Sequence, residues 1–357
     1  MSEKAFLHLK DIVKKFGNFT ALDGVDLGIH KGEFFTIVGP SGSGKSTLIR
    51  LLVGMDDVTT GEIHLNGKRI DQTPANLRPT CMVFQSLALF PHMSVGQNIE
   101  FPLKLRKESP AARRTRALEL LDLLRLPQEY YDKRISQCSG GEQQRVALAR
   151  ALAFNPEILF FDEPLSALDY RLRKTLEKEL KDLHARTGKT FVYITHSLEE
   201  AMVMSDRIAI MKDGCIEQVA VADEIYGKPV SRFVAEFMGE VNLFPISADA
   251  KGTLLSDFLL VKNCLEVNVV PPNAQGLLMV RPEYVRFVND GESYDFNLSG
   301  QIHGEYALGS RIQYEIETTA GIITVEKLRE DRLNASNGDA VTVGFNSNCT
   351  HFICDAI

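Results

Sequence analysis

A glycine-rich segment near the N-terminus restricts the fold of this chain more than any other feature. Residues 39–46 read Gly-Pro-Ser-Gly-Ser-Gly-Lys-Ser and fit the phosphate-binding pattern GxxxxGK[ST]. The apolar run Phe34–Val38 precedes the loop like a buried strand, and the helical spacing of Lys45–Val53 follows it. A strand, a glycine loop and a helix in this order predict an α/β domain that binds phosphate at the helix N-terminus.

The loop supplies most of the predicted nucleotide-binding residues. Its glycines let backbone N–H groups approach a phosphate with no side chain in the way. The lysine can reach the β- and γ-phosphates, and the serine hydroxyl after it can bind Mg²⁺. We therefore expect nucleotide contacts from a run of consecutive residues: Gly39, Pro40, Ser41, Gly42, Ser43, Gly44, Lys45, Ser46 and Thr47.

Two carboxylates follow a second strand-like run. Asp162 and Glu163 come directly after Ile158–Phe161. A carboxylate at the C-terminal tip of a buried strand can hold Mg²⁺, which prefers oxygen ligands, and its neighbour can orient or deprotonate a water. The alternative is an acidic helix cap. Together with the glycine loop, the pair predicts a P-loop NTPase of a class that these residues leave open.

A second glycine-rich segment differs from the loop at 39–46 because it contains no lysine. Residues 138–142 read Cys-Ser-Gly-Gly-Glu and precede the helix-forming stretch Gln143–Phe154. One lysine-bearing loop and one lysine-free nest would be explained if each nucleotide were shared by two copies of the chain. The alternative is an ordinary serine N-cap, worth about 1 kcal/mol, which spacing alone favours.

Taken in order, these motifs resemble those of ATP-binding-cassette (ABC) ATPases over nearly all of residues 6–238. The resemblance covers a Walker A loop at 39–47, a Q-loop glutamine, a signature at 138–142, a Walker B strand at 160–164, a D-loop at 166–169 and a switch histidine. The glutamine is Gln85 and the histidine is His196. Phe16 stands where the family places an aromatic residue that stacks on adenine.

The resemblance implies a head-to-tail homodimer that binds two ATP molecules between its subunits. It implies that Glu163 polarises the attacking water and that His196 contacts the γ-phosphate. Gln85 would sense the Mg²⁺ that Ser46 and Asp162 hold. The residues implied to contact the partner's nucleotide lie in the signature and the D-loop: Ser139, Gly140, Gly141, Glu142 and Asp169.

Some residues depart from the family pattern. Phe16 replaces the commoner tyrosine, Cys138 a leucine, Glu142 a frequent glutamine, and Ser197 an aspartate. An aromatic ring still stacks without its hydroxyl, and a carboxylate suits a helix start. We expect none of these residues to abolish activity.

The sequence changes character after residue 238. Short alternating runs such as Ile312–Ile316 and Val341–Val343 predict a small antiparallel barrel. Arg281-Pro282-Glu283 and residues 306–310 resemble the TOBE-like barrel of bacterial importer ATPases. We therefore expect an ABC domain at 1–238, whose parallel core sheet carries an antiparallel β subdomain and a helical subdomain at about 86–155, and an all-β OB/TOBE-like regulatory domain at 239–357.

The resemblance also implies partners and a location. It implies a motor on the cytoplasmic face of the inner membrane, bound to integral membrane permease subunits and served indirectly by an extracytoplasmic solute-binding protein. The stretch Leu87–Met93 matches the region that receives the permease, with core packing as the alternative. The arrangement is most similar to polyamine (spermidine/putrescine) importers, and ferric iron, sugar, sulfate and other small solutes stay open.

Composition and motifs argue against several other classes of function. With 40 basic and 47 acidic residues the net charge is −7, so we expect no nucleic-acid partner. No apolar run reaches the roughly 18 residues of a membrane span, and the N-terminus lacks a signal core. A single cassette without heptads disfavours a soluble repair or translation ATPase, and the presence of Glu163 and His196 disfavours a binding-only regulatory subunit. The scattered cysteines predict no metal site.

Overall fold

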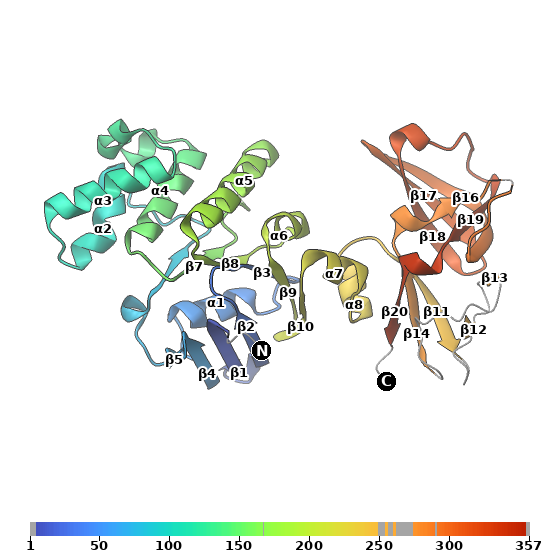
Figure 1. The fold of residues 1–357 in the computed structure, drawn as a ribbon, viewed down its shortest axis with the longest axis horizontal. Coiled ribbons are helices and arrows are strands. Elements are labelled where there is room, and N and C mark those ends of the chain that lie inside the picture. Colours follow the sequence, from blue (N-terminus) through green and yellow to red (C-terminus); the bar gives the residue numbers. More distant parts are fainter. Residues whose placement is uncertain are drawn as a thin grey trace. The chain divides into compact units, whose positions relative to one another are not determined.

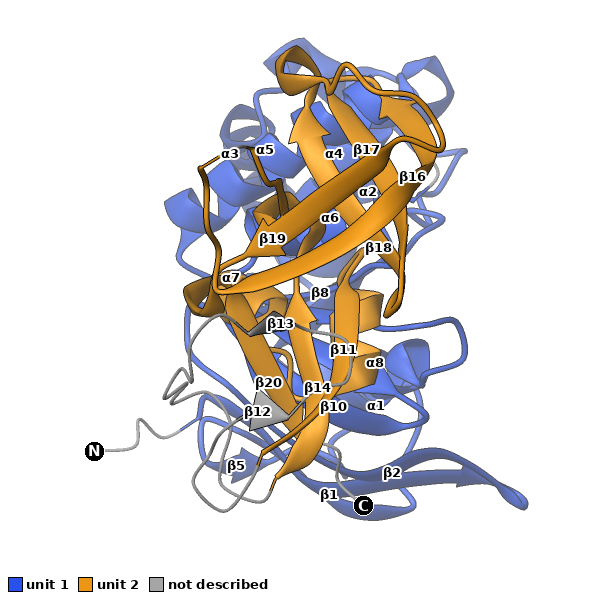
Figure 2. Ribbon diagram, turned by 90° about the vertical axis from the view of Figure 1, so that its right-hand side faces the viewer, with its two compact units in different colours: residues 1–222 blue, residues 223–357 orange. Residues whose placement is uncertain are grey.

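The computed structural model describes residues 5–166, 168–248, 254–255, 260–261, 274–289 and 291–354, so Ala167 of the D-loop lies outside it. The chain divides into two compact units, residues 1–222 and 223–357 (Figure 2). Helix α7 (Ala222–Gly227) begins at this division, and α8 (Arg232–Phe237) falls in unit 2. The domain boundary after residue 238 stays a prediction.

Unit 1 is built on a mainly parallel sheet with the strand order β10-β9-β3-β8-β7-β6. The strands are β3 (Phe34–Val38), β6 (Thr80–Val83), β7 (Ile158–Asp162), β8 (Thr190–Ile194), β9 (Arg207–Lys212) and β10 (Cys215–Ala220). Every residue of β3 and β8 is buried, as expected for strands covered on both faces. The predicted parallel α/β core is confirmed.

A second sheet of unit 1 is antiparallel and has the order β2-β1-β4-β5. Its strands are β1 (Leu7–Phe16), β2 (Phe19–Ile29), β4 (Thr60–Leu65) and β5 (Lys68–Arg69). Helix α1 (Lys45–Val53) lies between the two sheets and shares a buried core with both (Figure 1). The start of α1, and with it the glycine loop, is therefore held from two sides.

Three helices form a separate layer, here called the helical layer: α2 (Val95–Leu105), α3 (Pro110–Leu123) and α4 (Gly140–Ala153). A 3₁₀ turn, Gln128–Asp132, connects α3 toward α4. Buried residues of all three helices share one core with β7 and with α5 (Tyr170–Thr187). These helices lie within the stretch in which the sequence predicts a helical subdomain.

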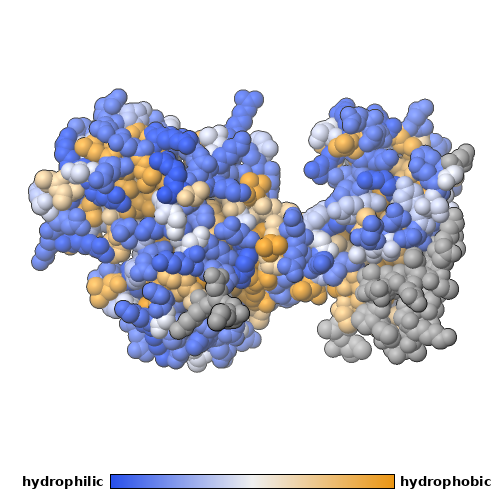
Figure 3. Space-filling view, in the orientation of Figure 1, coloured by the Kyte–Doolittle hydropathy of each residue, from blue (hydrophilic) through white to orange (hydrophobic). Residues whose placement is uncertain are grey.

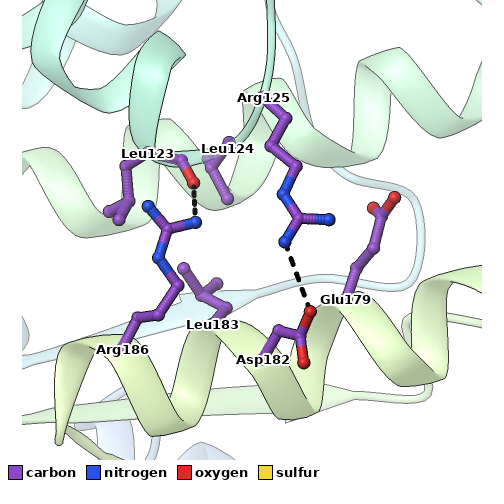
Figure 4. Close-up of a pocket in the computed structure, with 7 residues that line it drawn as sticks. All are labelled: Leu123, Leu124, Arg125, Glu179, Asp182, Leu183 and Arg186. Atoms are coloured by element: carbon purple, nitrogen blue, oxygen red, sulfur yellow. Dashed lines mark hydrogen bonds and ion pairs between the residues drawn. The ribbon is translucent and has the colours of Figure 1, made fainter.

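Polar contacts join the helical layer to α5. Arg125 lies 3.4 Å from Asp182, and Arg186 Nη1 donates to the Leu123 carbonyl at 2.9 Å, on either side of a small pocket (Figure 4). Arg145 of α4 pairs with Glu179 of α5 through bonds of 2.9 and 2.6 Å. The layer is thus fixed to α5 by charged side chains as well as by its core. Helix α6 (Leu198–Met204) follows β8.

The strands of unit 2 pair as two antiparallel sheets, ordered β12-β11-β14-β20 and β15-β19-β16-β17-β18, with β13 beside β16. They are β11 (Asn242–Ala248), β12 (Leu254–Leu255), β13 (Leu260–Val261), β14 (Gln275–Val280), β15 (Arg286–Phe287), β16 (Phe296–Leu308), β17 (Arg311–Thr318), β18 (Gly321–Leu328), β19 (Ala340–Phe345) and β20 (Thr350–Cys354). One hydrophobic core lies between them. Helices α7 and α8 precede residue 239, and the described elements beyond it are strands and 3₁₀ turns, so the all-β fold predicted there is confirmed.

Two buried polar side chains organise unit 2. The Arg281 guanidinium donates to the carbonyls of Tyr226, Ala235 and Gly239 at 2.9–3.2 Å, and so satisfies the ends of α7 and α8. Asn242 pairs with the backbone of Thr324 on β18, donating to its carbonyl and accepting from its N–H, both at 2.8 Å. An amide side chain thus takes the place of a neighbouring strand at this point of β18.

Hydrophilic residues cover most of the face of unit 1 drawn in Figure 3, with hydrophobic residues in scattered patches. Within the described part of the chain, no helix combines the length and the apolar character needed to cross a membrane.

Candidate functional site

The glycine loop joins β3 to α1 in a conformation that requires glycine. Gly42 and Gly44 have φ angles of 82° and 101°, in the left-handed region. A Cβ on Gly39 would lie 2.1 Å from the Met211 carbonyl oxygen, and one on Gly44 would lie 2.7 Å from that of Ala21. The close packing at Gly39 and Gly44 and the angles of Gly42 and Gly44 therefore disfavour larger residues at these three positions.

Lys45 lies across the loop that precedes it. Its Nζ donates to the carbonyl oxygens of Gly39 and Pro40, each at 2.8 Å, and to Ser43 Oγ at 3.2 Å. Burial lowers the pKa of this ammonium, and the charges of Glu163 and Asp162 oppose the shift. A cation held here, at a helix N-terminus, is suited to binding phosphate oxygens.

Asp162 ends β7 and Glu163 follows it, and the charges of both act on this lysine. Burial raises the pKa of Asp162, and the neighbouring Glu163 carboxylate raises it further, while His196 and Lys45 lower it. Glu163 shares a pocket with Ser46, and the carboxylates of Asp162 and Glu163 and the Ser46 hydroxyl are oxygen donors of the kind that Mg²⁺ prefers. The residues present therefore fit a magnesium ion.

Glu163 is held in an uncommon conformation. Its φ of 47° lies in the left-handed region, which costs a non-glycine residue about 1–2 kcal/mol. Its N–H donates to the Ile194 carbonyl at 3.0 Å, and its side chain lies 2.5 Å from His196 Nε2. Ser166 Oγ donates to the Glu163 carbonyl and accepts from Gln85 Nε2, both at 2.9 Å. The structure thus joins Gln85, Glu163 and His196 through short contacts.

Many of the predicted nucleotide-binding residues line one pocket. It is lined by Phe19, Ala21, Ser41, Gly42, Gly44, Lys45, Ser46, Thr47, Glu163 and His196. Other predicted residues of the same site do not line it in the described part of the chain: Phe16, Gly39, Pro40, Ser43, Gln85 and Asp162. Of these, Gly39, Pro40 and Ser43 touch Lys45, and Gln85 reaches Glu163 through Ser166.

The aromatic side of this pocket was incompletely predicted. Phe16 and Phe19 are register partners at the turn of the β1–β2 hairpin, and their exposed fractions are 50% and 64%. Lys14 Nζ lies 4.8 Å from the centre of the Phe16 ring. The resemblance selects Phe16, whereas Phe19 lines the pocket. The sequence places Phe19 only three positions after Phe16, and this proximity is the signal that could have pointed to Phe19 as well.

The signature residues begin α4 and do not line this pocket. Ser139 is the N-cap, and it forms a capping box with Glu142. A Cβ on Gly140 would meet nothing within 4 Å, so its backbone faces open space. Asp169 caps α5 by accepting from the Leu172 N–H at 3.1 Å. The cap and first residue of each helix, Ser139 with Gly140 and Asp169 with Tyr170, are thus exposed on the single chain.

Arg150, in the last turn of α4, was not predicted from the sequence. It donates from Nη1 to the Ala88 carbonyl at 2.7 Å and from Nη2 to the Leu87 carbonyl at 2.8 Å. Leu87 and Ala88 have left-handed φ angles of 59° and 48°. The arginine therefore fixes the segment after Gln85, and no local pattern in the sequence could have shown a contact of such long range.

The chain matches known families along both units. The profile of the ABC transporter family matches residues 22–166, and that of the TOBE domain matches residues 278–353. A spermidine/putrescine import ATP-binding protein of Roseobacter denitrificans is 42% identical over 92% of this chain and 92% of its own length. One of Chromobacterium violaceum is 38% identical over 98% of this chain and 100% of its own length.

A solved structure agrees for the first unit. The dimeric, post-hydrolysis structure of an ATP-binding cassette bound to ADP and Pi is 36% identical to this chain, with a TM-score of 0.53. It covers 60% of this chain and 98% of its own. With a glycine loop, a carboxylate pair and a signature helix in family order, the chain belongs to the ABC transporter family, as an ATPase that carries a C-terminal TOBE domain.

Proposed function

We propose that this chain hydrolyses ATP to drive the import of spermidine or putrescine through a separate membrane permease. The observation that carries the proposal is the similarity, along nearly the whole chain, to relatives that are named spermidine/putrescine import ATP-binding proteins. The alternatives within the same function are ferric iron, sugar, sulfate or another small solute.

The chain's own residues supply the steps at the phosphates. Lys45 and the N–H groups of the glycine loop bind the β- and γ-phosphates. Glu163 orients and polarises the attacking water, and His196, 2.5 Å from Glu163, positions that carboxylate and contacts the γ-phosphate. Mg²⁺, held by Ser46, Gln85 and Asp162, neutralises charge on the phosphates when it is bound.

Two copies of the chain form the complete site in this proposal. Ser139 and Gly140 at the start of α4 and Asp169 at the start of α5 lie beside the nucleotide of the partner in this arrangement, because they are exposed on one chain and do not line its own pocket. Gly141 and Glu142 belong to the same helix start and complete the signature. Phe16 or Phe19 stacks on the adenine. Closure of the dimer then assembles the site and gates hydrolysis.

An apolar groove in unit 1 fits the permease. It is lined by Val53, Met55, Ala75, Thr80, Cys81, Met82, Phe84, Ala88, Phe90, Phe101, Pro102, Leu105, Arg150 and Ala151. The predicted permease-binding stretch 87–93 contributes Ala88 and Phe90 to it. We propose that a short helical segment of the permease occupies this groove, where it also meets the segment fixed by Arg150.

A carboxamide at position 163 tests the catalytic role. Glu163→Gln keeps the size of the side chain and removes its charge, so ATP-bound dimers should accumulate while turnover falls by at least a hundredfold. Sedimentation with ATP and phosphate release measure the two effects. The matched control is Glu119→Gln, an exposed carboxylate on α3, which should change neither. Normal turnover of Glu163→Gln would remove Glu163 from its role.

Mixed dimers test the shared site. One copy carries Lys45→Ala and the other Ser139→Arg, which together should leave at most one working site. Single-turnover hydrolysis counts the sites, and two full sites would contradict the head-to-tail arrangement.

The solute is tested by transport. The chain, its permease and its binding protein are reconstituted in vesicles, and uptake of labelled spermidine and putrescine is compared with that of ferric iron, maltose and sulfate. Uptake of one of the latter group alone would keep the motor and overturn the polyamine assignment.

A further inference from the structure

Glu142 places a carboxylate at the start of α4, the helix that the signature begins. Three groups donate hydrogen bonds to this carboxylate. Its Oε2 accepts from the Ser139 N–H at 2.8 Å and lies 3.3 Å from Lys133 Nζ. Its Oε1 accepts from the Tyr130 hydroxyl at 2.9 Å. Lys133 Nζ also lies 3.7 Å from the centre of the Tyr130 ring. The carboxylate is therefore turned toward the segment before α4.

These contacts bear on the repulsion expected between the Glu142 carboxylate and a phosphate bound at the same helix start. A negative side chain suits a helix N-terminus, but it repels the phosphate that the same N-terminus would bind. The Lys133 ammonium cancels the charge of the carboxylate, and both side chains are about three-quarters shielded from solvent, with exposed fractions of 24% each. Both oxygens of the carboxylate are occupied on the side of Ser139, Tyr130 and Lys133, so the exposed first residue of the helix, Gly140, stays open to a phosphate.

We propose that Lys133 and Tyr130 are positioning residues, which neutralise and orient Glu142 so that the signature can bind the partner's ATP. This inference deepens the proposed function and rests on its shared site. The ammonium acts through Glu142, without touching the nucleotide itself. Neither residue belongs to the signature, the D-loop or the glycine loop.

A purely structural role would predict a different pattern. The Lys133 backbone is held independently of its side chain, because its carbonyl accepts from the Val95 N–H at 2.9 Å. Tyr130 packs against the core of the helical layer. Loss of the ammonium alone should therefore leave the segment in place, and only the charge of Glu142 should become uncompensated.

The test is a double-substitution cycle on the full-length chain. Lys133→Met, Glu142→Gln and the double variant are made in the Glu163→Gln background, and the ATP concentration that gives half-maximal dimerisation is measured by sedimentation. Arg116→Met is the matched control, since it removes one paired charge from the same helical layer. Tyr130→Phe tests the second donor.

We expect Lys133→Met to raise the half-maximal ATP concentration about tenfold when Glu142 is present, as an uncompensated charge a few ångströms from a phosphate would. In the Glu142→Gln chain the same substitution should change it less than about twofold, because a neutral amide needs no counter-charge. The tenfold effect should shrink in high salt. Tyr130→Phe should have a smaller effect in the same direction, and Arg116→Met none.

Two results would overturn the inference while the proposed function stands. An equal loss with Glu142 and with Gln at that position would make Lys133 structural or a direct phosphate ligand. No loss in either chain would remove it from ATP binding. If the Glu163→Gln parent does not dimerise with ATP at all, the proposed function fails, and this inference with it.

Discussion

Replacing Arg150 by methionine should loosen the segment after Gln85 and leave the rest of unit 1 folded. Methionine keeps the apolar stem of the side chain but cannot donate hydrogen bonds to the carbonyls of Leu87 and Ala88, which are 2.8 and 2.7 Å away. Both of these residues have left-handed φ angles and would lose the hydrogen bonds that the guanidinium gives to their carbonyls. The effect should therefore appear locally, at residues 87–93.

The expected change in the free energy of local opening follows from the two hydrogen bonds that are lost. A hydrogen bond contributes about 1 kcal/mol net, and somewhat more when the donor is charged, while the left-handed backbone costs about 1–2 kcal/mol per residue. The loss of both bonds should therefore lower the free energy of local opening by about 2 kcal/mol, which is about a 30-fold change in the opening equilibrium. Burial lowers the pKa of Arg150, but the guanidinium remains charged near neutral pH.

Hydrogen exchange measures this opening directly. The Leu87 amide donates to the Phe84 carbonyl at 2.9 Å and should exchange about 30-fold faster in Arg150→Met. Arg145→Met is the control on the same helix, because Arg145 pairs with Glu179 and touches neither carbonyl. It should leave the exchange of Leu87 unchanged. Unaltered protection of Leu87 in Arg150→Met would refute the proposed role of the guanidinium.

Three further outcomes are expected. Gly44→Ala should weaken ATP binding at least about tenfold, since its Cβ would lie 2.7 Å from the Ala21 carbonyl at a φ of 101°; an unchanged affinity in a fluorescent-nucleotide titration would contradict this. Arg281→Met should destabilise unit 2 by about 3 kcal/mol, because several buried carbonyls lose their donor, and thermal unfolding should show a lower midpoint for that unit. Burial lowers the pKa of His351 from its ordinary 6.5, so the folded state binds fewer protons than the unfolded state below that pH. The stability that this histidine contributes is present above pH 6.5 and falls as the pH drops toward the folded pKa, and His351→Gln should remove this part of the pH dependence in denaturant titrations.

The local features of the fold could be predicted from short patterns. The helix Lys45–Val53 ends at Gly54, which has a left-handed φ of 80°, the conformation in which a glycine commonly ends a helix. The turn pairs at 66–67 and 213–214 lie between paired strands for the same reason, since their residues favour positive φ angles. The glycine loop could be predicted because its chemistry lies within consecutive residues.

Features that depend on distant contacts could not be predicted. The left-handed conformation of Glu163 depends on a carbonyl of β8, and that of Leu87 and Ala88 on Arg150, more than 60 positions away in the sequence. The choice between Phe16 and Phe19 depends on β1–β2 pairing, which contains several register shifts. No periodicity reveals such irregular pairing. The roles of the signature and of Asp169 stay predictions.

The side-chain amide of Asn242 bears on whether strand β18 of one molecule can pair with that of another. An open strand edge invites pairing with the same edge of another molecule, and this is a common route to strand exchange and to insoluble aggregates. By occupying the Thr324 N–H and carbonyl with one short side chain, the protein caps β18 from within its own unit. At Thr324 this border of the TOBE domain therefore offers no free N–H or carbonyl with which the same strand of a second copy could pair.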